Sequence, residues 1–253
     1  MRTSHLAPVL LALCASPAAA WDVNCKFTAE RQASIDTAGA EHVEIVARGG
    51  DLNVRPATGA RVLASGKACA SREEYLAETQ VHARRKGNVV QVFVQVPEDM
   101  KGIGTFYATL DLDVQVPAGL PVEVTDTSGD TTITKVRVTR ITDSSGDLLA
   151  RDLPADVEIN DSSGDIRIEN AAGLVKVTDS SGDIVVLGAR DVLIPSDSSG
   201  DIEIERVSGS VRIENDSSGD IVITTVERNV EVLADSSGTV RISGVTGTVR
   251  VPR

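Results

Sequence analysis

The chain is poor in aromatic side chains, with one Trp, two Tyr and three Phe among 253 residues. So few aromatic platforms exclude a rich sugar-binding groove, although hydrogen bonds alone could hold a polysaccharide weakly. Its three histidines, at positions 5, 42 and 82, fall outside the repeats described below, and no Cys-X-X-Cys pair occurs. The spacing of these residues is not that of a zinc site or a dithiol redox centre.

Basic residues are also in the minority, because 37 acidic side chains against 25 basic ones give a net charge of −12 at pH 7. A surface of this charge is unsuited to nucleic acid and to bare anionic membrane. The longest apolar run near the N-terminus, Leu6–Leu13, is too short to span a bilayer. We therefore expect no nucleic-acid partner and no direct insertion in a membrane after processing.

Residues 1–20 predict a secretory signal peptide. Arg2 supplies the positive end, Leu6–Leu13 the apolar core, and Ala18–Ala20 the small residues of a cleavage site. Cleavage after Ala20 would leave a mature chain that is exported to the periplasm or to the cell surface. Lipoprotein processing at Cys14 is the less favoured alternative, because Leu13 is a poor fit to the small residue expected before that cysteine.

After cleavage, Cys25 and Cys69 are the remaining cysteines. An even number of cysteines in an exported chain predicts a disulfide between them. Closing the loop between them would stabilise the fold by about 4 kcal/mol in the chain-entropy model.

The dominant feature is the motif Asp-Ser-Ser-Gly-Asp, which recurs at intervals of 17 to 19 residues in the second half of the chain. A variant, DTSGD, opens the series at Asp126, and DSSGT closes it. The intervening copies begin at Asp143, Asp161, Asp179, Asp197 and Asp216, and the last variant at Asp235. So short a period leaves no room for two helices per repeat, and it predicts a β-solenoid whose coils bury a shared core.

Within each repeat, apolar residues alternate with polar ones in two short runs, as in Ile202, Ile204, Val207, Val211 and Ile213. This period of two predicts strand, turn, strand, turn in every coil. The Ser-Ser-Gly segment forms one corner. A second, looser corner is assigned to glycines that tolerate positive φ: Gly173, Gly188, Gly209 and Gly247. The predicted fold class is all-β, a single-stranded parallel β-solenoid (β-helix) with about 18 residues per coil.

One outward column of the solenoid is predicted to alternate in charge, which would reinforce the register of stacked coils. Its members are Glu158, Lys176, Ile194, Arg212, Glu231 and Arg250. The coil that contains Val192–Pro195 departs from the pattern, because proline stands where an inward valine is expected. We predict a bulge or a local kink there.

Residues 21–118 are predicted to form a β-rich N-terminal region that caps the solenoid of residues 119–253. Strands are expected over Phe27–Ile35, His42–Val46, Arg61–Ala64, Val89–Val96 and Thr105–Val116. The segment Gly50–Val54 echoes the repeat and is interpreted as an early rung. Ser71 and Glu74 could form a capping box for a short helical turn, with a polar loop as the alternative.

The repeated Ser and Asp residues do not predict an enzyme. No His or Lys recurs at a fixed repeat position to activate a serine, and near-identical copies argue against one selected catalytic site. The stacked first aspartates could instead bind calcium, with a column at Asp143, Asp161, Asp179, Asp197, Asp216 and Asp235. We favour the other explanation, in which each first Asp accepts hydrogen bonds from the Ser and Gly amides of its own turn and serine hydroxyls bridge the rungs, and we predict no cofactor.

The run Leu112–Val124, leading into serial SSGD turns, resembles the bacterial putative-adhesin family of DSSG-repeat β-helix domains, largely a domain of unknown function. That resemblance implies an envelope location and offers no catalytic residues. We expect a non-enzymatic adhesin or envelope scaffold with an acidic repetitive surface. Its partner would be an envelope or surface protein or a matrix polysaccharide. The alternatives are an envelope-stress accessory that binds another envelope protein and a carbohydrate-active or calcium-binding β-helix.

A partner face is predicted from outward positions that break the polar pattern of the first strand in each coil. These positions are Leu149, Val185, Leu187 and Val222. Isolated exposed apolar residues are common on proteins, so an incidental stripe is the alternative.

Overall fold

The computed structural model describes residues 25–100 and 105–252, so the predicted signal peptide and Cys14 lie outside the described residues. Within these described ranges the regular elements are strands, apart from one helix, α1 (Glu73–Glu78). The strands are β1 (Phe27–Asp36), β2 (His42–Val46), β3 (Leu52–Ala57), β4 (Arg61–Ala70), β5 (Gln80–Lys86), β6 (Val89–Gln95), β7 (Ala108–Pro117), β8 (Val122–Thr125), β9 (Thr131–Thr134), β10 (Val138–Thr142), β11 (Leu148–Leu153), β12 (Val157–Asn160), β13 (Ile166–Thr178), β14 (Ile184–Ser196), β15 (Ile202–Val207), β16 (Val211–Ile213), β17 (Ile221–Val226), β18 (Val230–Val232), β19 (Val240–Val245) and β20 (Val249–Arg250).

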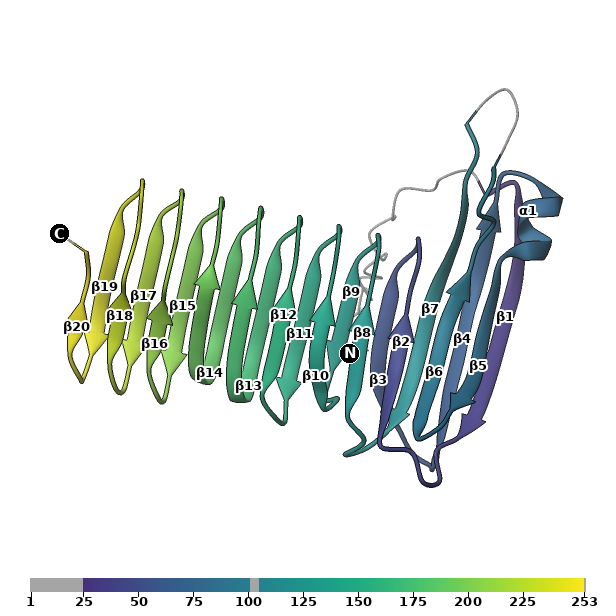
Figure 1. Ribbon diagram of the computed structural model, residues 1–253, viewed down its shortest axis with the longest axis horizontal. Helices are drawn as coiled ribbons and strands as arrows, with labels where there is room; N and C mark the ends of the chain where they lie inside the picture. Colours follow the sequence, from purple (N-terminus) through teal and green to yellow (C-terminus); the bar gives the residue numbers. More distant parts are fainter. Residues whose placement is uncertain (1–24, 101–104, 253) are drawn as a thin grey trace, which may run out of the picture.

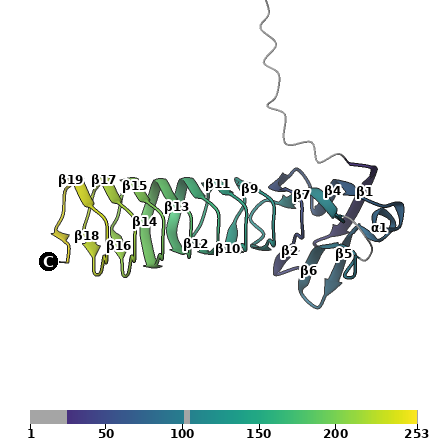
Figure 2. The same cartoon turned by 90° about the horizontal axis from the view of Figure 1, so that it is seen from above.

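The fold is a parallel β-solenoid, as predicted, and its coils stack into a rod (Figure 1). Strands of successive coils pair in parallel, with Leu148 opposite Thr131 and Ile221 opposite Val240. Two rows of strands result. In Figure 2, β9, β11, β15, β17 and β19 run along one side and β10, β12, β16 and β18 along the other, and β13 and β14 contribute to both. We call the row with β9 and β11 the first sheet and the row with β10 and β12 the second sheet.

The core lies between the two sheets, because the alternation in sequence points every second side chain inward. Ile166, Ile184, Ile202 and Ile221 stack in one inward column, and each is fully buried. Burial of one such side chain contributes roughly 1.5 to 3 kcal/mol. A single coil has too few of these residues to hold a core, so stability depends on stacking.

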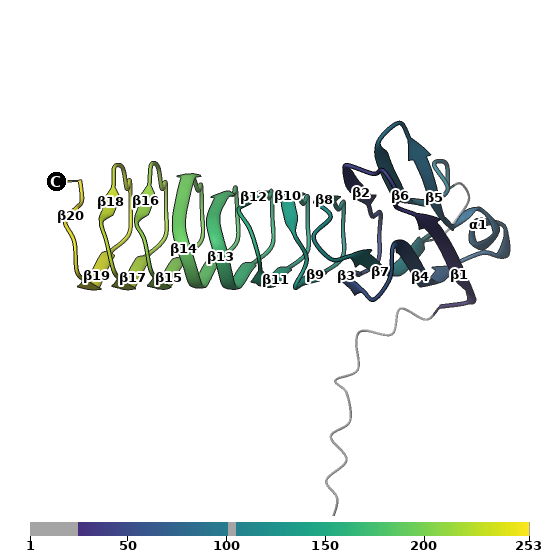
Figure 3. The ribbon, with the colours of Figure 1, turned by 90° about the horizontal axis from the view of Figure 1, so that it is seen from below.

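The N-terminal part continues both sheets and then closes them. β2 pairs in parallel with β8, and β3 with β9, so these two strands form the early rung expected from Gly50–Val54. On their other side, β6 pairs with β2 and β7 with β3, again in parallel. Beyond them the direction reverses, since β5 is antiparallel to β6 and β4 is antiparallel to β7 and β1 (Figure 3). Antiparallel strands cover the end of the rod.

The rung made by β2 and β3 therefore lies between strands that follow it in sequence. The chain builds this rung, leaves it to form β4 to β7, and returns to build β8 and β9 on its opposite face. The boundary at residues 118 and 119 stays a prediction, and the stacked rungs extend to its N-terminal side. Figure 1 shows β2 and β3 between β7 and β8.

The second corner differs from the prediction. Among the four glycines assigned to it, only Gly188 has positive φ. The left-handed residue lies five positions after the second Asp of each motif and is usually not glycine, namely Lys135, Asp152, Asn170, Gly188, Arg206, Thr225 and Gly244. Glycine is needed at Gly173, Gly209 and Gly247 for a different reason, because a Cβ there would collide with the backbone of the preceding coil.

The irregular coil is bulged, but Ile194 was placed wrongly. Val192 pairs with Val211 and Ile194 with Ile213, so Ile194 is fully buried and Leu193 takes the outward position. Between Ala189 and Asp191 the connection is one residue shorter than between Ala171 and Leu174 in the preceding coil, which shifts the strand that follows. Pro195 is the extra residue of the bulge, outside the regular pairing.

The charged column is otherwise confirmed. Glu158 lies 2.7 Å from Lys176 and 3.0 Å from Arg140, and Glu231 pairs with both Arg212 and Arg250. Exposed pairs of this kind contribute about 0.2 to 1 kcal/mol each, so their main effect is to favour the correct register.

The helical turn near Ser71 is confirmed as α1, but its predicted capping box is wrong. The residue that precedes the helix is Arg72, and its side chain makes no capping hydrogen bond. Ser71 instead contacts the residue that precedes β7, and its hydroxyl lies 3.3 Å from the carbonyl oxygen of Tyr107. Arg31 holds the helix end against β1 by donating to the carbonyl oxygens of Leu76 and Thr79 at 2.7 Å. Within the described residues, no helix is long and apolar enough to cross a membrane.

Candidate functional site

From Asp126 to Asp216, the first aspartate of each motif is buried at the corner of its coil. Asp143, Asp161, Asp179, Asp197 and Asp216 are at most 6% exposed. Asp179 shows the arrangement, since its Oδ1 accepts hydrogen bonds from the amides of Ser180 at 2.6 Å and Ser181 at 3.3 Å. This Asx-type turn was predicted, except that the two serine amides donate rather than serine and glycine.

Serine hydroxyls bridge the coils, as expected. Ser163 Oγ donates to the carbonyl oxygen of Ser144 at 3.1 Å, and Ser181 Oγ donates to that of Ser162 at the same distance. The motif glycine has a role in stacking as well. Gly182 has φ +132°, and a Cβ on it would collide with the carbonyl oxygen of Gly164. The whole motif is therefore a stacking unit.

The second oxygen of each buried aspartate has no hydrogen-bond partner. Atoms in this state are Oδ2 of Asp143, Asp161, Asp179 and Asp197, both oxygens of Asp216, and Oδ1 of Asp235. The exception is Asp126, whose Oδ2 accepts from the Thr131 hydroxyl at 3.0 Å. In later coils the position of Thr131 is held by Leu, Ile or Val, which can donate nothing.

Burial of these carboxyls without a full set of partners favours their neutral form. Burial, reinforced by the neighbouring aspartates of the column, raises the pKa of Asp143 and Asp197 to about 7. Burial likewise raises the pKa of Asp179 to about 6. The column therefore binds protons in the range where ordinary carboxyls are already ionised.

The second aspartate of each motif forms a separate, exposed ladder. The backbone N–H of each donates to Oδ1 of the equivalent residue in the neighbouring coil, as Asp183 N–H does to Asp165 at 3.0 Å. The ladder begins in the cap and ends at the DSSGT variant. Its members in spatial order are Asp111, Asp51, Asp130, Asp147, Asp165, Asp183, Asp201, Asp220 and Thr239. These charge-assisted bonds offset the repulsion between stacked carboxylates.

The calcium hypothesis gains no support from this geometry. The free oxygens of the first-aspartate column are buried next to aliphatic residues, whereas Ca²⁺ takes six to eight oxygen ligands. Among residues 25–100 and 105–252, no group of three or more His, Cys, Asp or Glu side chains is arranged to hold a metal ion.

The predicted partner face is less continuous than expected. Leu149, Val185 and Val222 lie in one outward column of the first sheet, but Arg167 and Glu203 alternate with them. Leu187 lies in the next outward column, between Glu169 and Glu205. The four apolar side chains are half-buried. The face thus presents apolar and charged groups in alternation.

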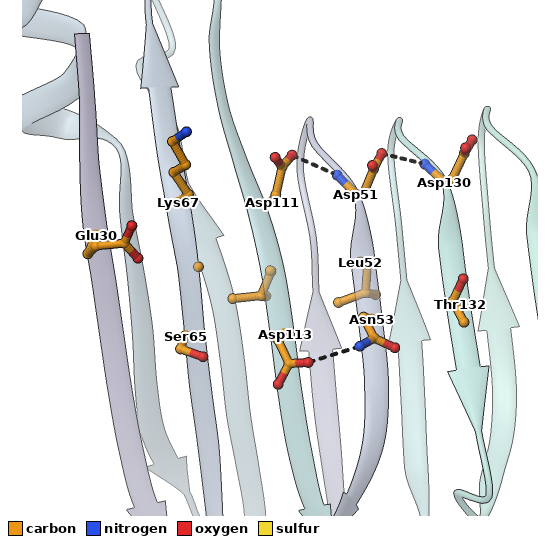
Figure 4. A pocket seen from close by; sticks show the side chains of 12 residues that line it. Glu30, Asp51, Leu52, Asn53, Ser65, Lys67, Asp111, Asp113, Asp130 and Thr132 are labelled. Carbon is orange, nitrogen blue, oxygen red and sulfur yellow. Dashed lines mark hydrogen bonds between the residues drawn. The ribbon is translucent and has the colours of Figure 1, made fainter. Parts of the chain in front are cut away.

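An acidic groove of about 750 Å³ lies where the cap joins the rod (Figure 4). Asp51, Asp111 and Asp130 line it at the start of the aspartate ladder, and Lys67 is the single basic residue of its lining. Deeper in the groove, Asp113 is held by Arg55 in a two-point ion pair at 2.9 and 3.0 Å. Asp51 was visible in the sequence as part of the degenerate repeat, whereas Asp111 carries no repeat signal and could not be assigned to the ladder.

A smaller groove of about 300 Å³ lies on the outer face of β2 and β6. Arg48, Arg84 and Phe93 line it together with Val46, Val94 and two glutamines, Gln91 and Gln95. This site could not be predicted from the sequence, because its residues come from separate strands and follow no motif.

The cysteines are joined as predicted. A disulfide links Cys25 to Cys69, whose Cα atoms are 5.5 Å apart, and it ties the start of β1 to β4. The bond fixes the outermost antiparallel strands of the cap to each other.

The stacked coils and the antiparallel cap define a capped parallel β-solenoid. The chain belongs to the Toastrack DUF4097 family, whose model matches residues 22–206. No protein with a curated description matches the chain.

Several solved structures are similar to this chain at low sequence identity. A putative lipid binding protein from Parabacteroides distasonis has 17% identity and a TM-score of 0.53, with 88% of this chain and 97% of that one covered. A putative cell adhesion protein from Clostridium sporogenes has 13% identity and a TM-score of 0.41, with 88% and 100% covered. A putative adhesin from Bacteroides fragilis has 12% identity and a TM-score of 0.41, with 90% and 98% covered.

Proposed function

We propose that the chain is an exported, non-enzymatic scaffold that binds an envelope or surface protein through the outward face of its first sheet. The observation that carries this proposal is the alternation of Leu149, Val185 and Val222 with Arg167 and Glu203 along the rod. Apolar side chains supply contact area, while the charges between them select the register and identity of a partner.

The length of the rod suits such a contact. Coils stacked about 4.8 Å apart make a face of roughly 30 Å, which matches a protein interface of ordinary size. Export is supported by the Cys25–Cys69 disulfide, since disulfides persist in oxidising compartments. Periplasm and cell surface are both consistent with it, and fractionation combined with protease accessibility distinguishes them.

A binding role without turnover agrees with the chemistry of the repeats. His82 contacts Gln95, and His42 lies 3.5 Å from Glu44, so both described histidines are engaged in the cap rather than beside the motif serines. The runner-up is an adhesin for a matrix polysaccharide, from which the exposed serine hydroxyls that bridge the coils could still accept hydrogen bonds.

Incubation with a panel of polysaccharides tests the absence of turnover. We expect the protein at most to bind a polysaccharide, without releasing reducing sugar from it. Release that is abolished by changing a single motif aspartate, but not by the same change in another coil, would overturn the scaffold proposal.

A further inference from the structure

The arginines of the rod and those of the small groove differ in their partners. Most rod arginines lie within ion-pair distance of a carboxylate: Arg140, Arg151, Arg167, Arg190, Arg206, Arg212, Arg241 and Arg250. Among the described residues, no carboxylate pairs with Arg48 or Arg84, although acidic residues are in excess in this chain. Two unpaired guanidinium groups in one groove form a site for an anion.

The groove is built to hold one of these arginines in place. Glu44 accepts a hydrogen bond of 2.6 Å from the Gln91 amide, and Gln91 Oε1 accepts one of 3.0 Å from Arg84 Nε. The Arg84 guanidinium also lies 4.6 Å from the centre of the Phe93 ring, which is stacked on His82. These contacts use Nε and one face of the guanidinium, so its terminal nitrogens remain as donors for a ligand.

Three features narrow the class of ligand. The volume of about 300 Å³ is at the lower limit for ligand pockets, so it suits one small ring rather than a long polymer segment. Gln95 lies beside the arginines, and its amide can donate to hydroxyl groups. The net charge of −12 opposes a long polyanion, whereas a compact anion near Arg48 is screened from the rod beyond about 8 Å at physiological salt.

We propose that this groove, between Arg48 and Arg84, binds an acidic sugar residue through its carboxylate or phosphate group. The arginines bind the anion, Gln95 binds a ring hydroxyl, and Val46 and Phe93 contact the apolar side of the ring. This site is separate from the protein-binding face of the rod, and it gives the cap a recognition function of its own.

The test is titration of the full mature protein with glucuronate, glucose 1-phosphate, glucose and inorganic phosphate, followed by calorimetry and by NMR shifts of amides in β5 and β6. We expect glucuronate or glucose 1-phosphate to bind at least about tenfold more tightly than glucose and inorganic phosphate. Arg48→Gln and Arg84→Gln should each weaken that binding by about tenfold or more. The matched control is Arg140→Gln, which removes a rod arginine paired with Glu158 and should bind as the unchanged protein does.

Melting of each variant confirms that the fold is intact before binding is compared. The proposal is overturned if the double variant of Arg48 and Arg84 binds normally, if inorganic phosphate binds as tightly as the sugars, or if phosphatidylglycerol vesicles bind in preference to them. Val185→Glu with Leu187→Glu should leave sugar binding unchanged. Failure of the sugar-binding proposal can therefore be distinguished from failure of the proposed protein binding by the first sheet.

Discussion

The hydroxyl of Thr131 donates a hydrogen bond of 3.0 Å to Oδ2 of Asp126, which gives this buried aspartate a partner that the equivalent residues of later coils lack. Asp179 is the clearest comparison. Its equivalent of Thr131 is Ile184, which is fully buried, and its Oδ2 has no partner. One hydroxyl thus separates the first coil of the series from the rest.

Burial of the aspartate column predicts an unusual dependence of stability on pH. The pKa of Asp143 and Asp197 is raised to about 7 and that of Asp179 to about 6, so the folded chain binds more protons than the unfolded chain between about pH 4 and pH 7. The free energy of unfolding contributed by these groups is greatest below pH 4 and is lost as the pH rises through 6 to 7. Urea unfolding at pH 5, 6, 7 and 8 should show a falling midpoint.

Ile184→Thr tests the cause of that slope, because it offers Asp179 the partner that Thr131 gives Asp126. The variant loses buried apolar surface and should be less stable overall, by roughly 1 to 2 kcal/mol. Its fall in stability between pH 5 and pH 8 should nevertheless be smaller than that of the unchanged chain. An equal or steeper fall would show that the orphaned oxygen is not the origin of the effect.

The left-handed corner predicts a substitution that stabilises the fold. Thr225 is exposed and has φ 58°, a conformation that costs a β-branched residue roughly 1 to 2 kcal/mol. Thr225→Gly should therefore raise the melting temperature, with a net gain of about 0.5 to 1 kcal/mol after the entropy of the unfolded chain is included. The neighbouring change Thr224→Gly, in a β17 residue paired with Glu205, should lower it. A loss in both variants would contradict this account of the corner.

The disulfide should be closed and should stabilise the cap. In folded exported protein, the peptides that contain Cys25 and Cys69 should resist alkylation until the protein is reduced, which mass spectrometry measures. Replacing both cysteines by Ala should lower the free energy of unfolding by about 4 kcal/mol, since the bond closes a separation of 44 residues. Alkylation of both thiols without reduction would refute the pairing in the cell.

Much of this fold could be predicted because the same alternation of apolar and polar residues recurs in every repeat. Ile202 and Ile204 could be placed inward from period-two alternation alone, and the structure confirms it. Ile194 could not be placed, because a one-residue shortening near Gly188 and a bulge at Pro195 cancel within the coil. Local patterning fixes which face a residue takes only while the register is kept.

The β2–β3 rung lies between the β6–β7 pair and the β8–β9 pair through long-range pairings that no local pattern encodes. The candidate sites also differ in how far the local sequence predicts them. Each turn aspartate was predicted to be capped by amides, but the partner of its second oxygen depends on the side chain five positions later, Thr131 for Asp126 and Ile184 for Asp179, which the apolar alternation alone does not distinguish. Arg48 and Arg84 are brought into one groove only by the pairing of β2 with β6 and of β6 with β5. The groove of Arg48 and Arg84 is therefore set by tertiary structure and leaves no local signature in the sequence.

The most direct test of the scaffold proposal compares binding of three forms of the chain, each beginning at Trp21, to isolated envelopes of the cells that make it. Val185→Glu with Leu187→Glu places two charges on the first sheet, while Thr142→Glu with Thr178→Glu places two on the second sheet as a control of equal charge. The account predicts at least about a tenfold loss of affinity for the first variant and normal affinity for the control. Equal binding by all three forms, or an equal loss in both variants, would contradict it.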